Sequence, residues 1–349
     1  MIDIENHTPF PCLAFEKYGR YGVLFDVIAF RMTLRLKNGY YADLADRQAG
    51  LVMADEYYGE PETSSLKYET DLVLYKKNTD IHVIGNARSA GSSLPYWRAG
   101  IRVGNFSKRF NLCGPRYWRY ENRRWQLSPA ENVDAVPLRY ELAYGGVWQL
   151  EGQEKQVFQA NPVGRGYYPD IRALDTKLQY SSPQIIGHHQ TEDSEHLIDT
   201  PDVPQGTGPV SRWWQSRLQY AGTYDDEWLG NRYPFLPDDF DEHFYSSAHP
   251  ELIHPGHLSG DEGIVLEGLL SDASRVVTGL PGLRPILVLK DRRGNPHTQI
   301  PVADTLTINL DEHQIYLTWR LTVPAALELK EGVLGCIVPP KTKGACHGR

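Results

Sequence analysis

Alternation of apolar and polar residues is strongest in residues 28–37. Apolar side chains occupy every second position from Ile28 to Leu36, and polar side chains occupy most positions between them. Successive side chains of a strand point to opposite faces, so this pattern predicts a half-buried strand. Asn38-Gly39 follows directly. Both residues tolerate the positive φ of a type I′ turn, so we expect the chain to reverse there in a hairpin.

Shorter periodic segments predict further strands towards both ends of the chain. Alternation returns at 305–310 and again at 315–323. Because only a short polar turn separates these two segments, they are expected to pair as a hairpin. The other expected strands lie at 71–76, 80–85, 97–103, 117–127, 138–144 and 286–289.

Residues 150–260 lack sustained alternation. Seven prolines and three of the eight tryptophans fall within 201–260. Proline removes a ladder donor, so continuous central strands are not expected there, and the aromatic residues argue against disorder. A short helix is predicted at about 211–220 with Ser211 as its N-cap. One or two helical turns are predicted at 325–331, and a frayed tail at 341–349.

These patterns predict a mainly β protein. We expect two antiparallel, sandwich-like β-sheet regions joined by a Pro/Trp-rich irregular segment with a few short helices. The expected division is an N-terminal antiparallel β domain at 1–150, a connecting segment packed on the sheets at 151–260, and a C-terminal β region at 261–349. The 31 glycines and 24 prolines among 349 residues agree with a loop-rich β protein.

Composition narrows the function classes. The formal net charge of −8 argues against a general nucleic-acid binder, which would carry a basic domain. The four cysteines are far apart and form no zinc-binding spacing. No secretory signal precedes the first strand, and no apolar run approaches the roughly 18 residues of a membrane span. We therefore expect a cytoplasmic protein without membrane insertion.

Candidate catalytic motifs are sparse. His249, His254 and His257 lie within nine residues, and three imidazoles could bind zinc or nickel in a metal-dependent hydrolase. The simpler interpretation is that these loop histidines are solvated or make local hydrogen bonds. No GxSxG, SxxK or Walker A motif occurs. No enzymatic activity, no metal and no cofactor are therefore expected, and the hydrolase is kept as the alternative.

Charge is unevenly distributed along the chain. Residues 97–124 carry a net +7 and interleave basic with aromatic residues, whereas residues 225–262 carry a net −9. The two stretches could pair with each other, or one could face a protein partner. Nucleic-acid binding by the basic stretch is a third alternative. Because Tyr, Trp and Arg dominate protein interfaces, the candidate partner-binding residues are Arg98, Arg102, Arg109, Arg116, Tyr117, Trp118 and Arg119.

Several phrases in the sequence are distinctive. They are PETSSLKYETDLVLYKKNTDIHVIG (61–85), PLRYELAYGG (137–146), NPVGRGYYPD (161–170), SRWWQSRLQYAGTYDDEWLGNRYPFLPDDFDEHFYSSAHPEL (211–252), LSGDEGIVLEGL (258–269) and DTLTINLDEHQIYLTWR (304–320). Their order and spacing resemble a bacterial domain-of-unknown-function family across essentially the whole chain. Members of that family are typically encoded beside type VI secretion spike proteins and toxic effectors.

The resemblance implies an adaptor or chaperone of Gram-negative bacteria. Such a protein binds a cognate toxic effector and helps to load it on the spike complex, with a spike or spike-tip protein as a further partner. The resemblance carries no catalytic residues. The phrases themselves contain turn glycines and capping side chains, so we expect a structural role for Gly145, Gly146, Asn161, Pro162, Gly164, Gly166, Tyr224, Asp225, Trp228, Pro237, Asp239 and Phe240. The oligomeric state is left open.

Overall fold

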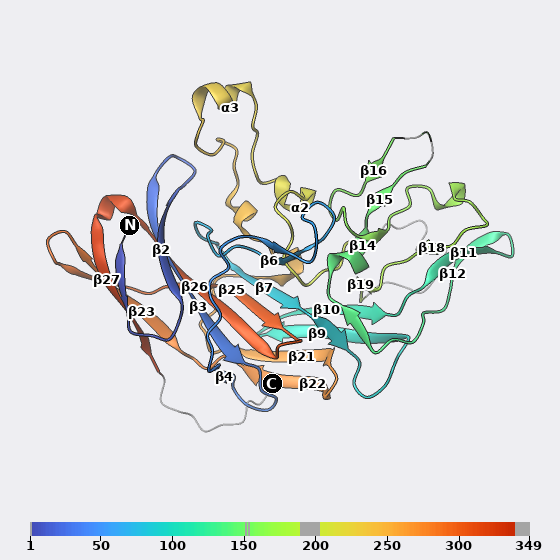
Figure 1. The fold of residues 1–349 in the computed structure, drawn as a ribbon, viewed down its shortest axis with the longest axis horizontal. Coiled ribbons are helices and arrows are strands. Elements are labelled where there is room, and N and C mark those ends of the chain that lie inside the picture. The colour runs from blue at the N-terminus through green and yellow to red at the C-terminus, as the bar shows by residue number, and fades with distance from the viewer. Residues whose placement is uncertain (1, 151, 153, 189–202, 339–349) are drawn as a thin grey trace.

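Two large β-sheets pack face to face at the centre of the molecule (Figure 1). The structure is a computed structural model that describes residues 2–150, 152, 154–188 and 203–338. Strands are far more abundant than helices in these residues, so the predicted mainly β class is confirmed. The expected tail at 341–349 lies outside the described residues.

The first sheet has seven strands in the order β2-β3-β26-β25-β7-β20, with β4 paired to the end of β3. β3 pairs with β26 over eleven residues, and β25 and β7 run parallel. The strands are β2 (Cys12–Tyr18), β3 (Leu24–Arg35), β26 (Gln314–Pro324), β25 (Val302–Asn309), β7 (Thr79–Ile84), β20 (Ile253–His254) and β4 (Asp43–Leu44).

The second sheet has five antiparallel strands in the order β19-β10-β9-β21-β22. Its inward side chains, such as Trp97 and Phe110, join those of the first sheet in one apolar core. The strands are β19 (Ile185–Gly187), β10 (Phe106–Cys113), β9 (Tyr96–Val103), β21 (Gly263–Leu270) and β22 (Ala273–Gly279).

Smaller sheets flank the two central ones (Figure 1). A four-stranded sheet contains β1 (Asp3–Asn6), β27 (Leu329–Ile337), β23 (Arg284–Asp291) and β24 (Pro296–Gln299), and a three-stranded sheet contains β12 (Arg124–Leu127), β11 (Tyr117–Glu121) and β18 (Tyr180–Ser181). The two-stranded pairs are β5 (Glu56–Tyr57) with β6 (Leu66–Tyr68), β8 (Asn86–Arg88) with β13 (Ala135–Pro137), β14 (Tyr144–Gly145) with β17 (Arg165–Gly166), and β15 (Val147–Trp148) with β16 (Gln156–Val157).

Helices in the described residues are short. None has the length or the apolar character that crossing a bilayer requires. They are α2 (Gln215–Leu218), α3 (Asp226–Asn231) and the 3-10 turns η1 (Tyr140–Leu142), η2 (Ile171–Ala173), η3 (Glu242–Tyr245), η4 (Pro250–Leu252) and η5 (Ala325–Leu327).

Both central sheets draw strands from distant parts of the chain. In the seven-stranded sheet, β26 and β25 lie between β3 and β7, and β20 comes from the segment between the two ends of the chain. In the five-stranded sheet, β9 and β10 lie beside β21 and β22, and β19 comes from that same segment. The described residues between 151 and 260 are mainly irregular, with a few short strands and helices.

The strand predicted at 28–37 forms as β3, but it is buried on both faces rather than one. Ile28 and Phe30 lie in the apolar core, and Arg31 and Thr33 on the opposite face are also buried. The turn after it differs too. Instead of a two-residue hairpin, a loop at 36–42 leads to β4, and the Gly39 amide donates to Val277 of β22 at 2.7 Å.

Two predicted strands do not form. Residues 71–76 run irregularly over the first sheet, and residues 138–144 contain the turn η1 instead. The predicted hairpin at 305–323 is present as β25 and β26, and 97–103 is present as β9. The helix predicted at 211–220 is shortened to α2, whose N-cap is Trp214 and not Ser211.

Candidate protein-binding site

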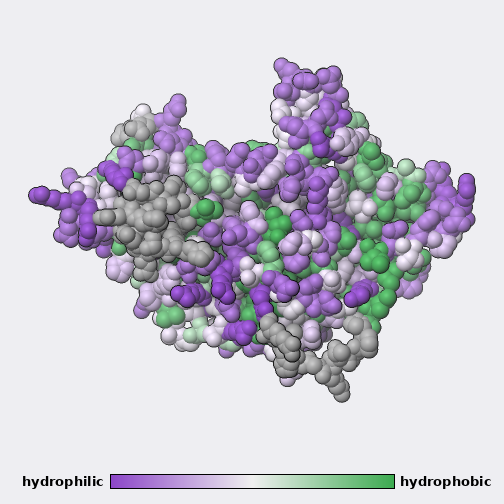
Figure 2. Space-filling view, turned by 180° about the vertical axis from the view of Figure 1, so that it is seen from behind, coloured by the Kyte–Doolittle hydropathy of each residue, from purple (hydrophilic) through white to green (hydrophobic). Residues whose placement is uncertain are grey.

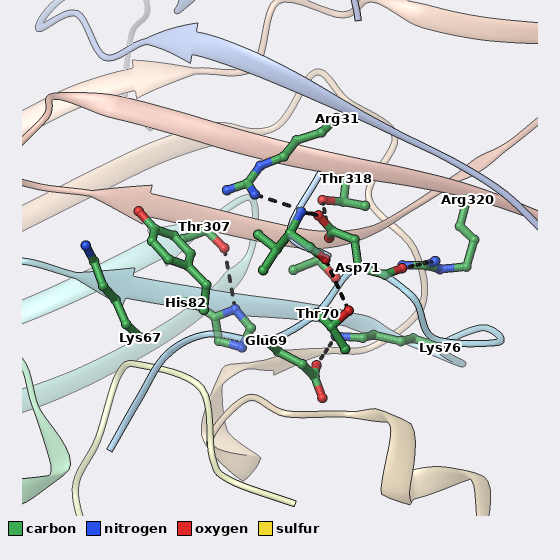
Figure 3. Close-up of a pocket in the computed structure, with 13 residues that line it drawn as sticks. Arg31, Lys67, Glu69, Thr70, Asp71, Lys76, His82, Thr307, Thr318 and Arg320 are labelled. Atoms are coloured by element: carbon green, nitrogen blue, oxygen red, sulfur yellow. Dashed lines mark hydrogen bonds and ion pairs between the residues drawn. The ribbon is translucent and has the colours of Figure 1, made fainter. Parts of the chain in front are cut away.

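The polar face of the seven-stranded sheet is covered and holds a network of ionised side chains (Figure 3). The covering residues come from segments 52–76 and 205–247. Four cations and four carboxylates meet there, so their formal charges cancel, and each side chain is at most 8% exposed. They are Arg31, Lys76, Arg217, Arg320, Glu69, Asp71, Asp80 and Asp304.

Glu69 and Lys76 tie the covering segments to the sheet. Lys76 Nζ lies 3.1 Å from Glu69 Oε2 and 2.6 Å from Asp80 Oδ2 on β7. Arg217 Nη2 on α2 donates to Glu69 Oε1 at 2.7 Å. Burial alone would raise the pKa of Glu69 and lower that of Lys76, but the opposite charges around them reverse both directions. Both groups therefore stay ionised at neutral pH.

Asp71 is the second anchor of this network. Arg31 Nη1 lies 3.7 Å from its Oδ2, and Thr318 Oγ1 donates to its Oδ1 at 3.1 Å. Arg320 donates to the Asp71 carbonyl and to Asp304 Oδ2, each at 2.6 Å. Figure 3 shows Arg31, Thr318 and Arg320 reaching Asp71 from the sheet. Side chains of the sheet thus hold the covering segment in place.

Ser247, His82 and Asp80 lie together in this network, but they do not form a catalytic triad. His82 Nε2 is 3.2 Å from Ser247 Oγ, whereas His82 Nδ1 faces Thr307 Oγ1 at 3.5 Å. Asp80 accepts from Lys76 and from the Ser247 amide rather than from the histidine. A triad needs the carboxylate on the histidine nitrogen opposite the nucleophile. Ser247 is also fully buried, so no substrate reaches it.

The cavity in this network is too small for a substrate. Its volume of about 20 Å³, lined by residues such as Arg31, His82 and Thr307, holds about one water molecule. Burial lowers the pKa of His82 to about 4, so the imidazole is neutral at physiological pH. The network therefore serves to position segments of the chain.

The three histidines of the hydrolase hypothesis have separate partners. His249 is buried, and its two ring nitrogens lie 3.0 Å from Lys108 Nζ and 3.0 Å from the Pro204 carbonyl. His254 packs edge-on against Phe106, and His257 Nε2 lies 2.9 Å from the Lys76 carbonyl. No group of three metal-binding side chains occurs among the described residues. The structure thus gives the hydrolase alternative no supporting observation.

The seven candidate partner-binding residues fall in two places. Arg98, Arg102 and Arg109 lie on the outer face of the five-stranded sheet, opposite the core-facing residues of β9 and β10. Arg116 and Trp118 are buried, because Trp118 packs with Trp125 in the small core beneath the three-stranded sheet. Tyr117 and Arg119 are half-buried beside them. In this structure the buried pair has no access to a partner.

The basic and acidic stretches face largely different surroundings. Lys108 Nζ lies 2.7 Å from Glu251 Oε2, which is an ion pair between the two stretches. Two acids of 225–241 have partners nearby: Asp238 forms an ion pair with Arg232, and Asp241 Oδ1 lies 2.6 Å from His243 Nδ1. The two stretches therefore present surfaces of opposite charge at different sites.

The AYGG and NPVGRG phrases interlock through their glycines. β14 and β17 pair in parallel, and the buried Asn161 donates from Nδ2 to the carbonyls of Tyr140 and Tyr144 at 2.9 Å. A Cβ on Gly145 would lie 2.2 Å from the Asn161 carbonyl oxygen, and one on Gly164 would lie 2.4 Å from Asn161 Nδ2. The backbone contact therefore requires glycine at both positions. Pro162, within the same turn, and Gly166, at φ +90°, complete the clamp.

Residues 223–239 form an arm that stands clear of the sheets and carries α3 at its tip (Figures 1 and 2). We call this segment the α3 arm. Its base is closed by Asp239, which accepts from the Thr223 amide at 2.9 Å and from Thr223 Oγ1 at 2.7 Å. Beside it, Phe240 enters a buried apolar cluster, and Pro237 contacts Gly222, which has φ +81°. The arm thus leaves and rejoins the body at one point.

Side chains of the family phrase hold the α3 arm together internally. Asp225 caps α3 by accepting from the Trp228 amide at 2.9 Å. Trp228 packs edge-on against Tyr224, with ring centroids 4.7 Å apart, and against Tyr233 at 5.7 Å. Its Nε1 donates to the Phe235 carbonyl at 2.9 Å. Asp225 and Trp228 thus make their contacts within the arm.

The α3 arm also packs on the turn between β2 and β3, at residues 19–23. Arg232 Nη2 donates to the Arg20 carbonyl at 2.7 Å, and the ring of Phe235 lies 5.5 Å from that of Tyr18. Arg20 in turn donates to the Asp238 carbonyl. The two projecting elements are therefore held against each other at the same end of the molecule.

Together these elements expose a cluster of large apolar side chains, which we call the arm surface. Its members are between 53% and 70% exposed, and the arm itself contains five acids and one base. Aromatic residues held rigidly in such a cluster are typical of protein-binding surfaces. The arm surface consists of Tyr18, Tyr21, Tyr224, Leu229 and Tyr233.

Of the five residues of the arm surface, the sequence analysis names only Tyr224, and it expects a structural role for it. The arm phrase signals a compact turn-rich segment, but nothing in it tells which aromatic rings point outward. Tyr18 and Tyr21 are two hundred residues away and join the surface only through the fold.

A family model covers most of the chain. Residues 22–320 match the family described as "Uncharacterized protein conserved in bacteria (DUF2169)". The chain belongs to the DUF2169 family. The match includes the clamp, the polar network and the α3 arm, so these features lie in the region that defines the family. Neither a curated protein nor a solved structure matched the chain.

Proposed function

We propose that this DUF2169 protein is a type VI secretion adaptor that binds a cognate toxic effector and helps to load it onto the spike complex. The observation that supports a binding role is the arm surface, where five large apolar side chains are exposed together on two projecting elements. The assignment to type VI secretion rests on the resemblance of the sequence phrases described above. The protein would act in the cytoplasm, before the effector is injected.

The chemistry of the arm surface indicates what it binds. Asp226 and Glu227 are exposed in the first turn of α3, beside Tyr224 and Leu229. Exposed carboxylates next to tyrosine rings favour lysine and arginine, through ion pairs and cation–π contacts. The proposed effector segment is therefore basic and carries apolar side chains that pack on the tyrosines.

The α3 arm is suited to this role because it is already ordered by its own contacts. The Asp225 cap, the Asp239 closure and the Trp228 packing fix its backbone without a partner. A preorganised surface loses less conformational entropy on binding, so more of the contact energy appears as affinity. Mechanistically, the adaptor covers exposed effector surface until the spike complex takes over the contact.

Substitution of the exposed arm residues tests the proposal. The effector encoded beside this protein should co-purify with it after co-expression. We expect the Leu229→Ala/Tyr233→Ala variant to weaken that complex at least tenfold, which corresponds to about 1.4 kcal/mol, as measured by calorimetry.

The matched control is Ile300→Ala, which removes a side chain that is 73% exposed and lies outside the arm surface. The control should leave the affinity unchanged. An effector that is soluble and secreted in a strain lacking this protein, or a complex indifferent to the arm substitutions, would contradict the proposal.

A further inference from the structure

The outer face of the five-stranded sheet carries a basic surface made by strand register. Four residues form a row across this sheet, one from each of the strands β10, β9, β21 and β22. In that order they are Arg109, Gly100, Glu267 and Arg275. Arg102 occupies the next outward position along β9, opposite Ser107. On the other side of Gly100, Arg98 points outward as well. Four arginines and one glutamate thus share one sheet face.

Two glycines open this face. Gly100 occupies the outward position between Arg98 and Arg102, so no side chain fills the centre of the row. Gly268 lies in a bulge of β21, where the register with β22 shifts, and a Cβ there would lie 2.2 Å from the Arg98 carbonyl oxygen. Bulges bend a strand and re-aim its neighbours, and they are common beside binding sites.

Two adjoining hollows result. One, of about 210 Å³, lies over Gly100 between Arg102, Arg109 and Glu267. The other, of about 300 Å³, has a mainly apolar lining that includes Ala90, Leu94 and Trp97, with Arg98 at its edge. Glu267 and Arg275 line both hollows and separate them. A cationic recess therefore adjoins an apolar one.

Two arginines of this surface, Arg98 and Arg109, are available to an anion. Arg98 and Arg109 are exposed and form no ion pair with any described residue. Arg275 lies 3.5 Å from Glu267, but both side chains are about half exposed, so water weakens that pair. Neighbouring unpaired cations repel one another, and a ligand that supplies carboxylates relieves the repulsion.

We propose that this face binds an acidic polypeptide segment of a partner protein. An apolar side chain of the segment enters the 300 Å³ hollow, and flanking carboxylates meet Arg98 and Arg109. A peptide fits better than nucleic acid, because Trp97 is only 7% exposed and no ring is offered for base stacking.

This surface is separate from the arm surface and has the opposite charge preference. It extends the proposed adaptor function with a second docking site, so that one molecule can hold two partners at once. Its test uses a synthetic peptide and no effector, so the two proposals can fail independently.

The experiment measures binding of a labelled peptide of alternating glutamates with one central phenylalanine by fluorescence anisotropy. We expect saturable binding that the Arg98→Glu/Arg109→Glu variant weakens at least tenfold. The control Arg47→Glu reverses another exposed arginine, outside both hollows, and should bind like the wild type. Circular dichroism confirms that each variant is folded.

Three comparison probes decide the chemistry. A peptide with glutamine in place of glutamate should bind at least tenfold more weakly, and one with alanine in place of phenylalanine should also lose affinity. A single-stranded oligonucleotide should not compete. The proposal is overturned by equal binding of the glutamine peptide, by efficient competition from the oligonucleotide, or by unchanged affinity of the double variant.

Discussion

His82 links the stability of this protein to pH at the scale of a single residue. Its ring lies between Ser247 and Thr307 in the buried network, and burial lowers its pKa to about 4 from the ordinary 6.5. In the unfolded chain the imidazole takes up a proton as the pH falls below about 6.5. The native state takes up the same proton only near pH 4.

The free energy of unfolding should therefore be constant above about pH 6.5 and fall as the pH decreases towards 4. One such histidine contributes about 3 kcal/mol over this window. We expect the His82→Gln variant, which keeps a polar side chain, to show a shallower decline. Urea denaturation at a series of pH values measures this difference.

His249 responds in the same direction, because burial and then Lys108 lower its pKa to about 4 as well. The His82→Gln variant therefore keeps part of the decline. His297→Gln, which changes an exposed histidine, serves as the control and should follow the wild type. A variant as steep as the wild type would show that His82 does not titrate in this way.

For single residues, the sequence predicts which side chains of a strand face the core better than it predicts whether the opposite face is exposed to water. Alternation correctly identified the core-facing residues Ile28 and Phe30. A half-buried strand would leave its polar face in water, whereas Arg31 on that face is buried near Asp71, and Arg320 of β26 is buried against Asp304. Alternation reports only the contrast between two faces. Whether the polar face is covered depends on segments far away in the chain.

At the scale of elements, the α3 arm depends on its capping residue. Asp225 accepts the Trp228 amide, and removal of an N-cap costs about 1 kcal/mol. We expect Asp225→Ala to speed hydrogen exchange of the α3 amides about fivefold, because 1 kcal/mol corresponds to such a factor in a local opening equilibrium. Exchange in β3 should not change.

The control for this prediction is Asp226→Ala, which removes the same charge but no capping bond. It should leave α3 exchange within about twofold of the wild type. If both variants exchange equally fast, the arm is held by charge or by Trp228 packing and not by the cap.

The strand predicted at 71–76 does not form, and hydrogen bonds of its backbone carbonyls explain why. The carbonyls of Asp71, Val73 and Leu74 accept hydrogen bonds from side chains of β26 rather than from a neighbouring strand. An apolar run rich in leucine and valine indicates burial. The apolar run does not show whether the backbone carbonyls will accept hydrogen bonds from a neighbouring strand or from a side chain such as that of an arginine.

The candidate site was predictable only in part for a similar reason. Arg98, Arg102 and Arg109 are three of the seven candidates, and they lie on one face of β9 and β10. Trp118 lies in the same stretch of basic and aromatic residues, but its side chain is buried. The arm surface combines residues near 20 with residues near 230, and no local pattern reveals that contact.

At the scale of the whole molecule, the buried ion network joins the sheet to its covering segments. Removal of one partner from a buried ion pair leaves an uncompensated charge and costs about 3–5 kcal/mol. We expect Arg320→Met to lose stability in this range, because Asp304 and two carbonyls then lack their donor. Urea denaturation at pH 7 measures the loss.

The matched control is Arg292→Met, whose exposed ion pair with Glu328 should contribute no more than about 1 kcal/mol. The double variant Asp304→Leu/Arg320→Met should recover part of the loss, since no unpaired carboxylate remains. Equal stability of Arg320→Met and Arg292→Met would show that the network is not needed to hold the fold.

The interleaved order of the central sheet has a consequence for synthesis. β3 and β7 leave the ribosome early, but the strands that lie between them, β25 and β26, are translated last. At 5–20 residues per second, the gap lasts on the order of ten seconds or more. During that time the apolar faces of the early strands lack their neighbours. The nascent chain therefore exposes apolar strand surface until β25 and β26 are translated and can complete the sheet.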